Sequence, residues 1–110
     1  MKVIKQEDFP LAERTRLIIR AYEVGRSPLF PDGIKFAFQY LYRSGEHWLE
    51  IARVDNYRHD SRKTGCHLHR LDVNGVEYKA LSFIEIEAFI IAVGDAIVQR
   101  LERGEHHGQH

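Results

Sequence analysis

The chain has 110 residues, of which 44% are hydrophobic and 29% are charged. This composition excludes an intrinsically disordered chain, and the length suffices for one hydrophobic core without disulfide or metal cross-links. The formal net charge is zero at pH 7, which excludes a uniform attraction of the whole surface to nucleic acid. We therefore expect a single domain over residues 1–110, with an ordered core at about residues 14–103 and a frayed tail at 104–110.

The chain also lacks the usual signals of export or membrane insertion. Cys66 is the only cysteine, so it cannot form an internal disulfide. The N-terminal segment has no apolar stretch of the signal-peptide type, and no run approaches the roughly 18 apolar residues of a membrane span. These features predict a cytoplasmic protein with no membrane association.

The first periodic segment, RTRLIIRAYEV at residues 14–24, fits two structures. Apolar residues at every second position from Leu17 to Ala21 indicate a strand, whereas Ile18 and Tyr22 also fit a helix that follows Pro10. A Pro/Gly-rich loop comes next. The residues by themselves leave both possibilities open.

The middle of the chain has the pattern of β-hairpins. Residues 34–43 alternate aromatic and aliphatic side chains with polar ones, and the short turn SGE leads into a partner strand at residues 47–55. The Asn-Gly pair at 74–75 is the strongest two-residue hairpin signal in the chain. It predicts that residues 66–73 pair with residues 76–80.

The last element is a helix at residues 83–103. Ser82 and Glu85 have the spacing of a capping box, and Gly104 is expected to end the helix. One apolar stripe consists of Phe83, Ile86, Ile90, Val93, Ile97 and Leu101, and a second consists of Ile84, Ala88, Ile91 and Val98. A surface helix needs only one such stripe, so the second favours a homodimer, unless the N-terminal segment covers it.

Together these elements predict an α+β fold. We expect an antiparallel sheet of four to five strands, with the C-terminal helix packed on one of its faces.

The polar stretch from Asp55 to Arg70 carries the candidate chemistry. His67 and His69 are two residues apart, so in an extended segment both imidazoles project from one face. Two imidazoles can divide general-base and general-acid work, as RNA cleavage through 2′-hydroxyl attack requires. They can equally bind a metal with His59, Asp55 or Asp60 as a third ligand, or simply be exposed on an edge strand.

The surrounding residues are compatible with nucleic-acid binding. Arg53 and Asp55 share one face of the preceding strand, and Tyr57 can stack on a base. The cations near the histidines can hold phosphate; they are Arg58, Arg62, Lys63 and Arg70. The alternative is an ordinary solvated loop.

Two neighbours of the histidines have simpler interpretations. Gly65 permits a positive φ just before the pair. Cys66 points away from His67 on a strand and is expected to be a packed residue, and one cysteine cannot build a zinc finger.

The order of these features resembles the TumE-type family of small prokaryotic proteins, which are described as the toxin components of toxin–antitoxin modules. In that family an R-x-D-N strand end precedes a Gly/His-rich turn with a closely spaced histidine pair, and a helix closes the domain. The resemblance covers roughly residues 14–103. Its most specific positions are Arg53, Asp55, Asn56, Gly65, His67 and His69. The loop before Gly65 is longer than usual, and Leu68 replaces the basic residue expected between the histidines.

The resemblance implies a toxin that acts on RNA or on translation and is inhibited by a DNA-binding antitoxin. It also favours the strand at residues 14–24. Our leading hypothesis is a metal-independent ribonuclease or RNA-binding protein without a cofactor. His67 and His69 are then acid/base residues, and Asp55 orients one of them. The substrate-binding residues are Arg53, Arg70, Arg58 and Tyr57, whereas Asn56 and Gly65 shape the backbone.

Two other hypotheses remain from the sequence. One is a non-catalytic α+β dimerisation module that binds a partner protein through its helix and sheet. The other is a metal-dependent hydrolase that uses His59, His67 and His69, although no carboxylate-rich set accompanies these residues.

Overall fold

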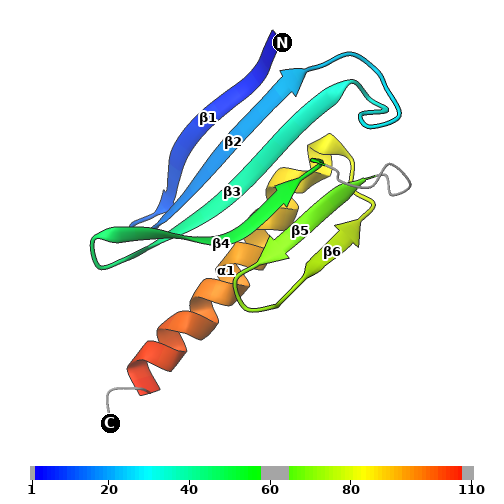
Figure 1. The fold of residues 1–110 in the computed structure, drawn as a ribbon. Coiled ribbons are helices and arrows are strands. Elements are labelled where there is room, and N and C mark those ends of the chain that lie inside the picture. The colour runs from blue at the N-terminus through cyan, green and yellow to red at the C-terminus, as the bar shows by residue number, and fades with distance from the viewer. Residues whose placement is uncertain (1, 58–64, 108–110) are drawn as a thin grey trace.

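The structure is a computed structural model that describes residues 2–57 and 65–107 of the chain. It confirms the α+β class: one antiparallel sheet with a C-terminal helix packed on it (Figure 1). The strands are β1 (Lys2–Ala12), β2 (Thr15–Glu23), β3 (Ile34–Ser44), β4 (His47–Asp55), β5 (Cys66–Arg70) and β6 (Val76–Lys79), and the helix is α1 (Phe83–His107). The strands pair in chain order, so each is joined to its neighbour by a local connection.

The sheet has six strands, one more than the upper limit expected from the sequence. The additional strand is β1, which pairs with β2 at the edge of the sheet. Most of its side chains are exposed, including the apolar Val3 and Ile4, so it lacks the alternation that marks a half-buried strand. Phe9, opposite Leu17, is partly buried against the core. The sheet therefore begins well before residue 14.

The segment that fits both a helix and a strand is β2. Leu17, Ile19 and Ala21 are completely buried, and the residues between them lie on the opposite face. Pairing with β3 along its whole length satisfies the backbone of this segment.

The first predicted hairpin has the expected turn, whereas the second has a longer connection than predicted. β3 and β4 meet at a tight turn in which Gly45 has a φ of 64°, as expected. In the second hairpin His69 lies opposite Val76, so the connection is longer than the predicted two-residue turn at 74–75. Within this connection Asp72 accepts hydrogen bonds from Arg70 (2.8 Å to Nη2 and 3.0 Å to Nε) and forms an ion pair with Arg100 of α1 at 3.2 Å.

The helix begins as predicted but continues past its expected end. α1 extends to His107, so Gly104 lies inside the helix rather than terminating it after Arg103. At the N-terminus the Glu85 carboxylate accepts hydrogen bonds from the Ser82 amide at 3.0 Å and the Ser82 hydroxyl at 2.7 Å. The Ser82 hydroxyl is therefore a donor to Glu85, instead of accepting from the Glu85 amide as in a full capping box.

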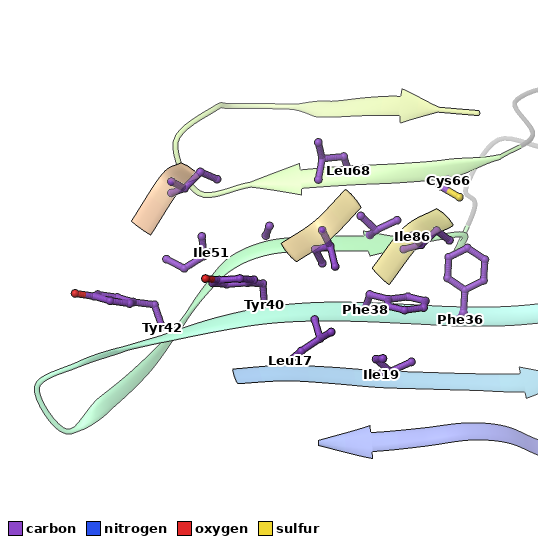
Figure 2. Packing of buried hydrophobic residues seen from close by; sticks show 14 of the residues in the cluster. Leu17, Ile19, Phe36, Phe38, Tyr40, Tyr42, Ile51, Cys66, Leu68 and Ile86 are labelled. Carbon is purple, nitrogen blue, oxygen red and sulfur yellow. The ribbon is translucent and has the colours of Figure 1, made fainter. Parts of the chain in front are cut away.

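The hydrophobic core lies between α1 and one face of the sheet. α1 packs on β3 and β4, and Figure 2 shows the side chains that these elements contribute. The largest completely buried ones are Leu17, Ile19, Phe38, Tyr40, Tyr42, Ile51, Val54, Leu68, Ile86, Ile90 and Ile97. Phe83 stacks edge-to-face on Phe36 and Phe38, with ring centroids 5.6 and 5.7 Å apart. This packing stabilises the first turn of the helix against the sheet.

The second apolar stripe of α1 is divided between the core and the surface. Val98 is buried and Ile91 is half-buried, whereas Ala88 is exposed and Ile84 is 89% exposed. Only the first turns of the helix thus carry uncovered apolar surface on this stripe. Within the part of the chain that the structure describes, no helix is long and apolar enough to cross a lipid bilayer.

Candidate functional site

The pairing of β4 with β5 brings the candidate residues together. Asp55 lies opposite His67, and Arg53 lies opposite His69. Directly opposed residues of antiparallel strands project from the same face. The residues between them, Val54 and Leu68, are buried in the core. The four polar side chains therefore lie on the face that α1 does not cover, which we call the open face; in Figure 1, β4 passes in front of the helix, so this face is toward the viewer.

Asp55 is the central residue of the site. It is only 4% exposed, and burying a carboxylate is costly unless charges or hydrogen bonds compensate. Its Oδ2 lies 3.0 Å from Nε of Arg53, and its Oδ1 accepts a hydrogen bond from the Tyr57 amide at 3.2 Å. These contacts neutralise and orient the carboxylate.

Asn56 fixes the backbone beside Asp55. Its side-chain carbonyl accepts from the Phe36 amide at 2.9 Å, and its amide group donates to the Ile34 carbonyl at 2.7 Å. The side chain thus continues the pairing with β3 at the point where β4 ends. The sequence predicted that Asn56 shapes the backbone, and in the structure its side chain anchors the end of β4 to β3.

Both histidines converge on the Asp55 carboxylate. Nε2 of His69 lies 3.4 Å from Oδ2, and Nδ1 of His67 lies 3.8 Å from Oδ1. His67 is buried and packs edge-to-face with the Tyr78 ring, with centroids 4.7 Å apart, whereas the His69 side chain is 30% exposed. One ligand atom from each of Asp55, His67 and His69 lies within 4.8 Å of the other two. We call these three residues the Asp55 cluster.

The Asp55 cluster lines a groove of about 380 Å³ on the open face. Its walls are Arg20, Ala37, Gln39, Arg53, Asp55, Tyr57, His67, His69, Val76 and Tyr78. Arg20, Gln39 and Tyr78 come from other strands and were not expected from the sequence. Only the register of the strands could have predicted them. Arg20, for example, lies opposite Ala37, which in turn lies opposite Asp55.

Arg70, a predicted phosphate ligand, lies outside the groove. It pairs with Ala52, a core residue, and therefore projects from the face that carries α1. Its guanidinium is occupied by Asp72, whose hydrogen bonds raise the pKa of Arg70. Another expected phosphate ligand, Arg58, lies outside the described residues, as do Arg62, Lys63 and the alternative metal ligands His59 and Asp60.

Gly65 and Cys66, which precede His67, have the backbone conformation and the burial expected of them, respectively. Gly65 has a φ of 109°, a conformation that favours glycine. Cys66 is buried on the helix side, and its thiol donates to the Leu81 carbonyl at 3.5 Å. Burial raises the pKa of this thiol, which makes it a poor nucleophile and agrees with a packing role.

Comparisons with models of known protein families, with curated proteins and with solved structures find no match to this chain. The resemblance to the TumE-type family therefore stays an expectation drawn from residues 14–103.

Proposed function

We propose that this protein is the toxin-type component of a toxin–antitoxin module and cleaves RNA in the groove of the open face. The observation that carries this proposal is the convergence of His67, His69 and Arg53 around the buried carboxylate of Asp55. A cytoplasmic DNA-binding antitoxin that covers the groove would keep the enzyme inactive.

The proposed reaction needs only proton transfer and charge stabilisation. The 2′-oxygen of a ribose attacks the adjacent phosphorus, and the bond from phosphorus to the 5′-oxygen breaks. One imidazole of the pair accepts the 2′-hydroxyl proton and the other donates a proton to the leaving 5′-oxygen. Asp55 orients His69, the more accessible of the two rings, and Arg53 stabilises the charge on the phosphate.

The open face also offers contacts for the rest of a single-stranded RNA. Tyr57 is 39% exposed and Trp48 is 40% exposed, so both can stack on bases. Lys35 lies over the ring of Tyr57 at 4.6 Å, and Arg16 lies over the ring of Trp48 at 5.2 Å. Lys35 therefore places a positive charge beside the Tyr57 ring, where it can hold a phosphate of the bound RNA, whereas the Arg16 charge beside Trp48 is also paired with Asp8 at 2.8 Å.

The direct test is RNA cleavage by the purified protein in EDTA. The wild type should cleave, and His67→Ala/His69→Ala should reduce the rate by about 10²-fold or more, the usual contribution of a positioned acid or base. His47→Ala is the matched control, because His47 is exposed at the other end of β4 and should not affect cleavage. Absence of cleavage by folded wild type, or equal rates in the double variant, would refute the proposal.

A second candidate function is supported by the exposed apolar side chain of Ile84. A non-catalytic module that binds a partner through α1 should tolerate His67→Ala and lose binding with Ile84→Asp. Expression in a bacterial host separates the two functions. A catalytic toxin slows growth without its antitoxin and His67→Ala relieves the effect, whereas a binding module gives the same growth with either chain.

A further inference from the structure

We propose that the Asp55 cluster is a binding site for one divalent transition-metal ion of the zinc type, and that its occupation blocks the proton-transfer role of the two histidines. The inference concerns regulation of the groove described above. Its binding part is independent of the proposed ribonuclease activity, and only its inhibitory part rests on that activity.

The distances within the Asp55 cluster are close to those between ligands of a common ion. A typical N–H···O hydrogen bond joins atoms 2.7–3.2 Å apart. The imidazole nitrogens of His69 and His67 lie 3.4 and 3.8 Å from the carboxylate oxygens, beyond that range. With metal–ligand bonds of about 2.1 Å, two ligands of a tetrahedral zinc ion are about 3.4 Å apart. Ligand atoms within 4.8 Å of one another can therefore reach one ion with shifts of less than about 1 Å.

The chemistry of the three ligands selects the class of ion. Two imidazoles and one carboxylate suit zinc and neighbouring transition metals, whereas magnesium and calcium prefer a shell of oxygen atoms. Three protein ligands that face a groove leave coordination positions for water or another small ligand. The site is therefore of the open type, unlike a closed structural zinc site.

The surroundings hold the ligands in place. The Tyr57 amide orients the Asp55 carboxylate, and the Tyr78 ring packs against His67. Such outer contacts fix ligand orientation in metal sites. The guanidinium of Arg53 compensates the charge of Asp55 without a metal, so the fold does not require the ion, and binding should be reversible.

Metal binding and proton transfer compete for the same atoms. An imidazole binds a metal through the lone pair that it needs in order to accept a proton. Once His67 and His69 coordinate an ion, neither can act as the general base. Zinc should therefore inhibit RNA cleavage, and a chelator should restore it.

The test must exclude zinc binding by the histidines near the C-terminus, which can bind the ion by themselves. The reference protein is His106→Gln/His107→Gln/His110→Gln, which retains the Asp55 cluster. Calorimetric titration with ZnCl₂ should show one ion bound per chain. His69→Gln in this background should weaken binding by more than about 100-fold, because even outer partners of a metal ligand contribute 10- to 100-fold. His47→Gln, which removes an exposed histidine elsewhere on β4, should leave the affinity unchanged.

Two further measurements separate the parts of the proposal. Asp55→Asn should also weaken zinc binding, and circular dichroism would establish that His69→Gln, which changes a partly exposed side chain, stays folded. Absence of zinc binding by the reference protein, or equal binding by His69→Gln, would overturn the metal site. If zinc binds but RNA cleavage is unchanged or faster, the inhibitory role is wrong; absence of cleavage in EDTA refutes the ribonuclease and not the metal site.

Discussion

At the residue scale, Asn56 shows how one side chain positions a functional group beside it. It replaces a pair of backbone hydrogen bonds between β4 and β3 and so fixes the strand end that carries Asp55. Gly94 has a comparable role in α1, where the absence of a side chain lets the helix backbone approach the ring of Tyr40. In both cases a small local feature determines how larger parts fit together.

We predict that Asn56→Ala lowers the free energy of unfolding by about 1–3 kcal/mol, because it leaves the Phe36 amide and the Ile34 carbonyl without a partner. Urea denaturation measures the change. Asn74→Ala, in the exposed β5–β6 loop, should change stability by less than about 0.5 kcal/mol. Equal effects of the two substitutions would contradict the anchoring role of Asn56.

We predict that Gly94→Ala destabilises the protein although alanine favours helices. A Cβ at position 94 would overlap the buried Tyr40 ring, whose hydroxyl donates to Asp95 at 2.5 Å and limits its movement. Overpacking of this kind costs about 1–3 kcal/mol or more, against about 1 kcal/mol of helix propensity. Gly104→Ala, where a Cβ has no neighbour within 4 Å, should stabilise the helix by up to about 1 kcal/mol. Thermal unfolding of the two variants should therefore shift in opposite directions.

At the element scale, the ends of α1 and the β5–β6 hairpin depend on charged groups. Glu85 caps the helix through Ser82, and these hydrogen bonds lower the pKa of Glu85. Asp72 connects Arg70 of β5 to Arg100 of α1. The hydrogen bonds that Arg70 donates lower the pKa of Asp72. A depressed carboxyl pKa means that the charged form stabilises the folded state.

We predict that Glu85→Ala lowers the Tm by a few degrees at pH 7. The folded pKa of Glu85 is below its usual value of 4.5, so its contribution is present above that pH and is lost as the pH falls through the folded pKa. The Tm difference between variant and wild type should therefore shrink as the pH falls below 4.5 and through the folded pKa. Scanning calorimetry over a series of acidic to neutral pH values checks this, and a difference that does not shrink on acidification would show that Glu85 acts by something other than its charge.

At the scale of the whole molecule, the two faces of the sheet have separate roles. The face toward α1 holds the core, and the open face holds the groove with the Asp55 cluster. This separation allows substitutions in the groove to change binding or catalysis with limited effect on packing. It also leaves Ile84 as the clearest apolar residue of α1 outside the core.

We predict that Ile90→Ala lowers the free energy of unfolding by about 2–5 kcal/mol, because Ile90 is completely buried between α1 and the sheet. Ile84→Ala should change it by less than about 0.5 kcal/mol in the monomer. The homodimer expected from the second stripe remains a prediction, and analytical ultracentrifugation tests it. A dimer that dissociates with Ile84→Asp would support that interface, whereas a wild-type monomer would contradict it.

The sequence by itself determined the local elements. The alternation in β3 and β4, the start of α1 and the positive φ of Gly65 follow from side-chain periodicity and backbone sterics, which act within a few residues. The two-residue spacing of His67 and His69 likewise placed both rings on one face. The same alternation excludes Arg70 from that face, just as it excludes Cys66.

Only the tertiary structure decided which distant residues meet. β1 carries a weak pattern because an edge strand whose side chains are mostly exposed is stabilised by pairing rather than by its own periodicity. Asp72 of the β5–β6 connection pairs with Arg100 of α1, a residue far from it in sequence. Arg20 reaches the groove through the register of three strands, and the burial of Asp55 depends on its partners there. Such contacts join residues of large sequence separation, so local propensity does not specify them.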